Sequence, residues 1–315
     1  MDTRHLVDPQ LLPMIEGVPP LDLSAETLSA TRAGAGTPSF VPTDVSAEER
    51  MVPGPENAPD VRVILTRPTT GTDGPRPGLL WIHGGGYVLG SPDADQALAS
   101  TFAGELDCVV VSVGYRLAPE TPHPGPLHDC YAALTWLHSH AAELGVDPDR
   151  IAVAGQSAGG GLTAALAQLA THDGRIPLRM QVLVYPMLDD RTVTRPDPNA
   201  YTGRYIWTRE NDKFGWTSLL GHEPGQDSAA PYAVPARTED LTGLPPAFVT
   251  VGALDLFLDE DITYAHRLLR SGVPTELHVL PGTTHNSFIL DGPQTSARMR
   301  QDVLTALRRA LAPQS

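Results

Sequence analysis

The sequence is poor in basic residues, and in lysine above all. Lys213 is the only lysine among 315 residues, and 22 basic residues stand against 37 acidic ones, which gives a formal net charge of −15. Nucleic acids and anionic membrane surfaces attract basic proteins, because both carry dense negative charge. The charge balance therefore argues against nucleic acid as a partner and against stable association with membranes.

Cysteine and long apolar runs are scarce as well. Cys108 lies in an apolar strand-like run and Cys130 in a helical pattern, so we expect two buried, reduced thiols. The chain has no run of 18 apolar residues, and residues 1–5 do not introduce the apolar core of a secretory signal. We expect a cytoplasmic protein, monomeric or homodimeric, and find no residue spacing typical of a zinc site.

A serine between a strand pattern and a helix pattern is the first candidate for chemistry. Residues 151–154 form a short apolar run, and residues 155–159 read Gly-Gln-Ser-Ala-Gly before an Ala/Leu-rich segment. In a tight strand-to-helix turn, the residues two before and two after the serine must be small, and here both are glycine. The helix points free N–H groups at the serine, where negative charge develops in acyl transfer. Ser157 is therefore our candidate nucleophile; an ordinary glycine-rich turn is the alternative.

A histidine and three glycines follow another apolar strand. His83 ends the run 79–83, and glycines 84–86 come next, leaving backbone N–H groups that can approach a ligand with no side chain in the way. A phosphate-binding loop is a competing interpretation, but no lysine follows and the spacing G-x-G-x-x-G is absent. Together with the serine turn, this motif predicts an oxyanion hole made by two loop N–H groups and the N–H of Ala158.

A nucleophilic serine needs a histidine as base. The candidates beyond the serine and its helix are His222, His266, His278 and His285. His266 falls within a helix pattern and His278 within a strand pattern, which favours structural roles, and His222 belongs to an irregular segment. His285 lies in a loop just past an apolar strand, where catalytic groups are commonly carried. We therefore expect His285 to be the base.

The base in turn needs a carboxylate that orients it. Asp255 lies three residues beyond the apolar strand 247–252 and precedes the histidine in the chain, which is the order found in hydrolases with this type of turn. Asp259 is the alternative, but it falls at the start of a helix pattern, where capping and the helix dipole explain it. We favour Asp255.

Strand and helix patterns alternate along most of the chain. Strands are expected at 61–66, 78–83, 108–115, 150–155, 180–185, 247–252 and 276–280, and helices at 127–144, 161–170, 259–271 and 294–311. This alternation predicts an α/β fold with a mostly parallel, twisted sheet flanked by helices. Residues 1–50, with short helices at 8–16 and 25–33, are expected to form an N-terminal cap segment. Residues 51–315 are expected to form the catalytic domain, with a cap insertion near 190–225.

Taken together, these motifs resemble the hormone-sensitive-lipase family of esterases. The resemblance rests on His83-Gly-Gly-Gly, Tyr115-Arg-Leu-Ala-Pro-Glu120, Gly155-Gln-Ser-Ala-Gly-Gly, Tyr185-Pro-Met-Leu-Asp-Asp190 and the Asp255/His285 spacing, and it runs from about residue 60 onward. It implies an α/β-hydrolase fold with a helical cap, a Ser157–Asp255–His285 triad and an oxyanion hole at Gly85, Gly86 and Ala158. His83 would hold the loop in shape. Gln156 stands where many members carry Asp, and Asn286-Ser287 where Gly-Phe is common.

The function that these features predict is hydrolysis of small, uncharged carboxylic esters without a metal or organic cofactor. Tyr87, Gln156, Tyr205 and Trp207 are candidate residues of the substrate pocket, and the bulky aromatics predict a closed pocket for short acyl chains. An amidase, formamidase or peptidase could use the same three groups. A small-molecule receptor on this fold is a further alternative, but such receptors typically lose a catalytic group, and all three candidates are present here.

Overall fold

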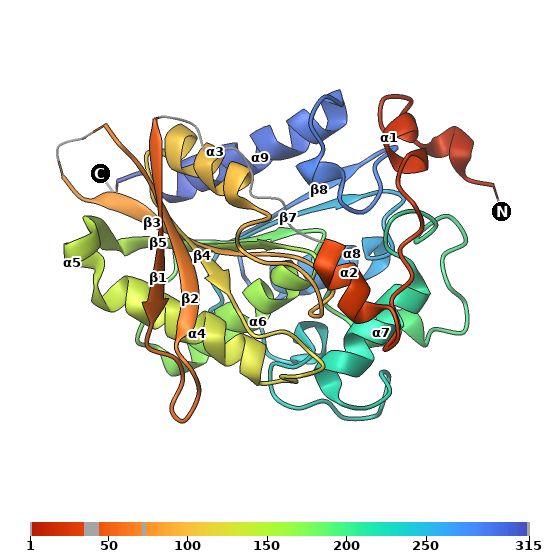
Figure 1. The fold of residues 1–315 in the computed structure, drawn as a ribbon, viewed down its shortest axis with the longest axis horizontal. Coiled ribbons are helices and arrows are strands. Elements are labelled where there is room, and N and C mark those ends of the chain that lie inside the picture. The colour runs from red at the N-terminus through yellow and green to blue at the C-terminus, as the bar shows by residue number, and fades with distance from the viewer. Residues whose placement is uncertain (1, 35–43, 71–73, 314–315) are drawn as a thin grey trace.

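A single eight-stranded sheet runs through the molecule. The computed structural model describes residues 2–34, 44–70 and 74–313, and Figure 1 shows its ribbon. The strands are β1 (Val45–Val52), β2 (Val61–Pro68), β3 (Arg76–Ile82), β4 (Val109–Gly114), β5 (Val146–Gln156), β6 (Gln181–Val184), β7 (Ala247–Gly252) and β8 (Thr275–Leu280). Their order across the sheet is β1-β2-β4-β3-β5-β6-β7-β8. β2 pairs antiparallel with β1 and β4, and all other pairs are parallel, which confirms the expected sheet.

Helices cover both faces of this sheet (Figure 1). They are α3 (Gln96–Leu106), α4 (Gly125–Ser139), α5 (Ala141–Leu144), α6 (Ala158–Asp173), α8 (Leu258–Arg270) and α9 (Gln294–Ala310). α3 and α9 pack on one face, where Phe102 and Met299 are buried in the same apolar cluster as Trp81 of β3. α4 and α6 cover the other face around Leu80, and α8 covers it beside β7. Because helices cover both faces of the sheet, its central strands are buried on both sides and have no polar side. Their sequences are therefore apolar throughout.

One strand and two α-helices were not predicted from the sequence. β1 reads Ser-Ala-Glu-Glu-Arg at 46–50, and this exposed edge strand has no alternation of apolar and polar residues. It crosses residue 50, where the N-terminal cap segment was expected to end, and the sheet begins with it at Val45. α3 supplies the crossover between the parallel strands β3 and β4. The third is α7 (Arg209–Leu220), which lies within the expected insertion.

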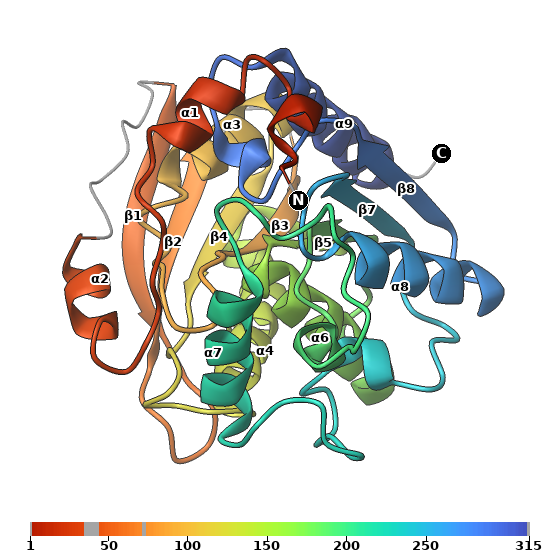
Figure 2. The ribbon, with the colours of Figure 1, turned by 90° about the vertical axis from the view of Figure 1, so that its right-hand side faces the viewer.

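The N-terminal segment and α7 lie together at one end of the sheet (Figures 1 and 2). The segment contains α1 (Leu12–Glu16) and α2 (Leu28–Gly34), both shorter than expected. Asn211 of α7 accepts a hydrogen bond from the Leu23 N–H and donates one to the Leu21 carbonyl. Arg32 of α2 donates to the carbonyls of Val88 and Ala118, close to the loop after β3. These contacts hold the segment over the end of the sheet where the candidate residues gather.

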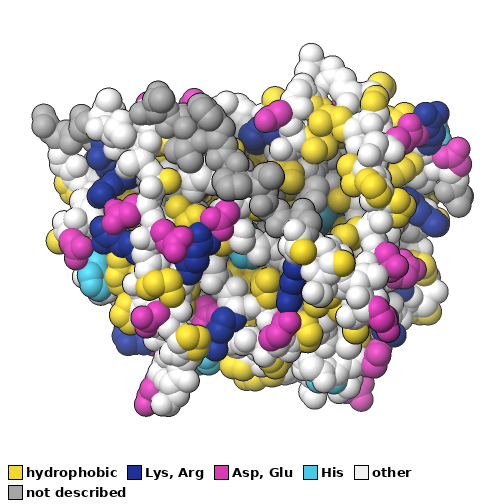
Figure 3. Space-filling model, in the orientation of Figure 1, with side chains coloured by type: hydrophobic (Ala, Val, Ile, Leu, Met, Phe, Trp, Pro, Cys, Tyr) yellow, Lys and Arg dark blue, Asp and Glu magenta, His cyan; other side chains and the backbone are white. Residues whose placement is uncertain are grey.

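The face of the molecule shown in Figure 3 carries charged side chains of both signs. On this face, acidic and basic side chains lie interspersed. Arg62 of β2, for example, pairs with Glu49 and with Asp93, each at 2.7 Å. Cys108 and Cys130 are buried and unpaired, as expected. Within the described ranges, no helix has the length and apolar character needed to cross a membrane.

Candidate active site

Ser157 occupies a strained turn between β5 and α6. Its backbone has φ 55° and ψ −124°, a region that L-residues rarely adopt. A Cβ on Gly155 would lie 2.4 Å from the Gly159 carbonyl oxygen, and one on Gly159 would lie 2.1 Å from that of Ile82. Both positions therefore require glycine, as the motif predicted. α6 begins at Ala158 and not near residue 161, because the glycines after it form the first, tightly packed turn of the helix.

His285 and Asp255 reach Ser157 from the ends of two other strands. His285 follows β8, and its Nε2 lies 2.9 Å from Ser157 Oγ, while its Nδ1 lies 2.8 Å from Asp255 Oδ2. A carboxylate only accepts, so Nδ1 carries the proton and Nε2 of the neutral ring accepts from the serine hydroxyl. Asp255 follows β7, and its Oδ1 accepts from the Phe257 N–H at 3.0 Å. At most 3% of each of the three residues is exposed.

The alternative bases and acid lie elsewhere. His222 and His266 are exposed, and His278 contacts Asp302 at 3.0 Å. Asp259 is half exposed and lies 3.9 Å from Arg195. The tertiary structure therefore brings the favoured three residues together and leaves the others apart.

The glycine loop after β3 lies against the serine. A Cβ on Gly84 would be 3.3 Å from Ser157 Cβ, and Gly85 and Gly86 have φ of +119° and +60°. Over the described ranges, the N–H groups of Gly85 and Gly86 donate to no other protein group. The N–H of Ala158 is also free of an intrahelical partner, since it belongs to the first turn of α6. The loop and the start of the helix thus offer backbone donors beside the Ser157 hydroxyl.

His83 holds the glycine loop through ring stacking and hydrogen bonds. Its ring stacks on Tyr115 at 4.2 Å, and its Nδ1–H donates to the Gly84 carbonyl at 2.8 Å. Tyr115 in turn donates from its hydroxyl to the His83 carbonyl. Burial lowers the pKa of His83 to about 4, so the ring is neutral at neutral pH. These contacts fit the expected role of holding the loop.

Aromatic rings enclose His285 on several sides. The ring centroids of Tyr185, Phe257 and Trp207 lie 4.7, 5.2 and 6.1 Å from that of His285. Phe257 and Tyr185 are fully buried, and Trp207 is nearly so. Neither Tyr185 nor Phe257 was singled out from the sequence as a neighbour of the base, because nothing in the local pattern indicates which side of a strand end their rings will face.

The other expected pocket residues are tied into the protein. Tyr87 is buried, and its hydroxyl donates to the Met187 carbonyl at 3.0 Å. Tyr205 is half-buried, and its hydroxyl contacts Thr3 of the N-terminal segment. The hydroxyl groups of both side chains thus bind the protein itself.

Gln156 belongs to a buried polar chain behind the serine. Its Nε2 donates to both carboxylate oxygens of Asp95, at 3.1 and 3.2 Å, and its Oε1 accepts from the Tyr185 hydroxyl at 2.9 Å. Trp81 donates to the same carboxylate from its indole N–H at 2.7 Å. Burial raises the pKa of Asp95 to about 6. The amide of Gln156 is therefore engaged away from the substrate, and Asp95, which sequence reasoning missed, provides the carboxyl group behind the turn.

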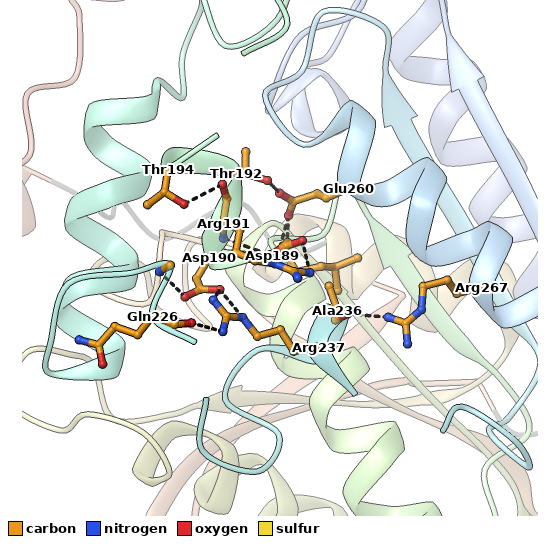
Figure 4. A network of polar contacts seen from close by, with 12 residues as sticks. Asp189, Asp190, Arg191, Thr192, Thr194, Gln226, Ala236, Arg237, Glu260 and Arg267 are labelled. Carbon is orange, nitrogen blue, oxygen red and sulfur yellow. Dashed lines mark hydrogen bonds and ion pairs between the residues drawn. The ribbon is translucent and has the colours of Figure 1, made fainter. Parts of the chain in front are cut away.

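A second polar network fixes the start of α8, just after Asp255 (Figure 4). Glu260 accepts hydrogen bonds from the backbone N–H groups of Leu188 and Asp189 and from the Thr192 hydroxyl. Burial raises the pKa of Glu260 well above its usual range. The 3-10 helix η2 (Asp190–Val193) is thereby tied to the segment that carries Asp255.

The residues that the structure describes form no metal centre. Across residues 2–34, 44–70 and 74–313, no three His, Cys, Asp or Glu side chains gather as metal ligands would.

Known proteins resemble this chain along almost its whole length. A family model described as the alpha/beta hydrolase fold matches residues 79–289. Carboxylesterase NlhH of Mycobacterium tuberculosis is 36% identical over 98% of this chain and 97% of its own length. Carboxylic ester hydrolase LipN of the same organism is 36% identical over 85% of this chain and 71% of its own. A solved structure of a bacterial heroin esterase superposes with a TM-score of 0.91 at 40% identity, covering 99% of this chain and 100% of that one.

Proposed function

This chain belongs to the hormone-sensitive-lipase family of α/β hydrolases and is a carboxylic ester hydrolase, and on that premise we propose that Ser157 is its nucleophile, His285 its base and Asp255 the acid that orients the base. We further propose that the expected cap segment, residues 1–50, of which the structure describes 2–34 ahead of β1, covers this site together with the insertion near 190–225. The substrate is a small, uncharged ester with a short acyl chain.

The hydrogen-bonded line from Asp255 through His285 to Ser157 carries this proposal. Ser157 Oγ attacks the ester carbonyl carbon while its proton passes to His285 Nε2. Asp255 stabilises the imidazolium that forms and keeps its proton on Nδ1. The carbonyl oxygen becomes an oxyanion that accepts from the N–H groups of Gly85, Gly86 and Ala158, which are already oriented before the reaction.

The intermediate then collapses and the ester bond breaks. His285 gives its proton to the leaving alkoxide, so an alcohol departs and the acyl group stays on Ser157. A water molecule attacks the acyl-enzyme, passes its proton to His285, and a second tetrahedral intermediate releases the carboxylic acid. The proton returns to Ser157 Oγ, which restores the enzyme.

Substitution of the three residues tests the assignment. We expect Ser157→Ala and His285→Ala each to lower kcat on an activated ester by roughly a million-fold, because the two groups act as a unit. Asp255→Asn should cost on the order of ten-thousand-fold, through the wrong imidazole tautomer. Asp259→Asn is the matched control and should keep nearly normal turnover. The measurement is p-nitrophenyl acetate hydrolysis with circular dichroism as a check of folding, and normal turnover by Asp255→Asn would refute the acid assignment.

A further inference from the structure

Trp207 lies directly over the candidate site. It precedes α7 and is only 4% exposed. A Cβ added to Gly86 would come within 2.2 Å of its Cη2 atom, so the indole rests on the backbone of the glycine loop. Its ring also lies 6.1 Å from that of His285, tilted by 35°. Trp207 thus borders both the proposed oxyanion donors and the proposed base.

The gap between these two rings is too narrow for a substrate group. Carbon atoms in contact are about 3.5–4.0 Å apart, so an alkyl chain between two rings needs roughly 7–8 Å from ring to ring. The 6.1 Å between centroids is an upper limit on the separation of the ring planes. A substituent extending in this direction must therefore stop short of Trp207 or displace it.

Asp212 of α7 holds the indole in this position. The Trp207 Nε1–H donates to Asp212 Oδ1 at 3.0 Å, and both side chains are buried. In the described part of the chain, Asp212 Oδ2 has no hydrogen-bond partner. Among the described residues, the indole N–H of Trp207 is thus the side-chain donor to this carboxyl group. Burial raises the pKa of Asp212 to about 8, so the group is mostly protonated at neutral pH.

The backbone before Trp207 is also constrained. Ile206 has φ +61°, and the Trp207 N–H donates to the Tyr205 carbonyl at 2.7 Å, which closes a three-residue turn. A β-branched residue at positive φ is strained by its own side chain. Such strain persists only where surrounding contacts enforce it, and the packed indole and its bond to Asp212 are contacts of that kind.

We propose that Trp207 is the residue that limits the size of the ester substituent on the Gly86 side of the reacting carbonyl, and that Asp212 is a positioning residue which acts through Trp207. This inference rests on the proposed function, because it takes Ser157 as the nucleophile. The upper limit on substrate size is then set by the Trp207 indole and by its hydrogen bond to Asp212.

Replacement of Trp207 tests the size limit. For Trp207→Ala and Trp207→Leu, kcat/KM would be measured on p-nitrophenyl esters from acetate to dodecanoate and on acetates of alcohols of increasing size. Each methylene that becomes able to bury adds about fourfold to binding. In at least one series, we therefore expect the ratio of kcat/KM for the large ester to that for acetate to rise tenfold or more. Trp136→Phe, in α4 and outside the site, is the control and should leave the ratio unchanged.

Replacement of Asp212 tests the positioning role. Asn keeps an acceptor oxygen in the same place and is neutral, as the protonated carboxyl is, whereas Leu has similar size but accepts no hydrogen bond. We expect Asp212→Leu to raise the ratio of large to small ester several-fold and Asp212→Asn to keep it within twofold. An effect on stability alone would lower the activity on all esters equally and leave the ratio unchanged.

The outcomes separate this inference from the proposed function. If Ser157→Ala is inactive and the ratio stays constant in all Trp207 and Asp212→Leu variants that fold, the inference is wrong although the function stands. Equal ratios in Asp212→Leu and Asp212→Asn would by themselves overturn the role of Asp212. Full activity in Ser157→Ala would instead refute the proposed nucleophile.

Discussion

Among single residues, Gln156 and Asp95 show how this chain departs from the pattern of its family. The position before the serine carries Asp in many members, whereas here it is Gln156, and the carboxyl group comes from Asp95, 61 positions earlier. Gln156 links that carboxyl to the Tyr185 hydroxyl, and the Tyr185 ring lies 4.7 Å from His285. In this chain a buried carboxyl group therefore lies behind the turn and is joined to it by the side chain of Gln156.

The ionisation of Asp95 should be visible in the stability of the protein. Its pKa is raised from 3.8 to about 6 on folding, so the folded state holds the proton more tightly than the unfolded chain. This contribution to stability is complete below about pH 4 and is lost as the pH rises through 6. Two pKa units correspond to about 3 kcal/mol. We expect the unfolding free energy of Asp95→Asn, relative to wild type, to rise by about that amount between pH 4 and pH 7.

Urea unfolding at four pH values between 4 and 7 measures this difference. The comparison is between the two proteins at each pH, so the titration of all other groups cancels to first order. A difference that does not change with pH would mean that Asp95 titrates normally in the folded protein.

At the level of elements, the position of Asp255 depends on how α8 begins. The loop after β7 carries Asp255, and Glu260 in the first turn of α8 holds η2 through two backbone N–H groups and the Thr192 hydroxyl. Asp189 and Asp190 add ion pairs to Arg191 and Arg237 at the same place (Figure 4). The carboxylate of Asp255, the proposed acid, is thereby placed by a junction between two elements that are far apart in the chain.

Glu260→Ala should loosen this junction. It leaves buried N–H groups without an acceptor, and each costs about 1–3 kcal/mol. We therefore expect unfolding free energy to fall by about 2–5 kcal/mol and kcat to fall with it, because the loop of Asp255 loses its support. Glu260→Gln is the matched control, because it has nearly the same shape and keeps one acceptor oxygen for the buried N–H groups. Equal stability of the two variants in urea would show that these hydrogen bonds contribute little.

For the whole molecule, the N-terminal segment is far from the candidate site in the sequence and close to it in the fold. The first residues pack against the loops that carry the site: Val7, Leu11 and Ile15 form an apolar cluster with Leu254, next to Asp255. α2 and α7 lie at the same end of the sheet (Figure 2). Ser157, the proposed nucleophile, is buried at this end of the sheet.

The burial of Ser157 predicts a preference for short acyl chains. Binding should improve with chain length by ~0.8 kcal/mol per buried methylene until the chain meets the wall. Beyond that point, even a small displacement of the carbonyl from Ser157 costs rate steeply. We expect kcat/KM on p-nitrophenyl esters to peak at about C2 to C6 and to collapse by C12, from the same positioning effect. A maximum at C10 or longer, or activation at an oil–water interface, would identify a lipase instead.

The sequence by itself determined the fold class and the nearest surroundings of Ser157. Alternating strands and helices require a mostly parallel sheet, and the turn at Ser157 is formed by residues adjacent in the chain, so its geometry can be inferred locally. His285 and Asp255 could be selected because each follows an apolar strand, and the carboxyl ends of parallel strands share one edge of the sheet. β1 escaped prediction because an edge strand with Glu and Arg carries no apolar alternation.

Only the tertiary structure decided which groups surround these residues. The bond from Asp95 to Gln156, the indole of Trp207 against Gly86 and the hold of Glu260 on η2 all join residues from different segments of the chain. Local patterns depend on a few neighbouring residues and contain no information about such partners. Their contacts are set by how helices and loops pack over the sheet, where burial, van der Waals contact and the pairing of buried polar groups must be satisfied at the same time.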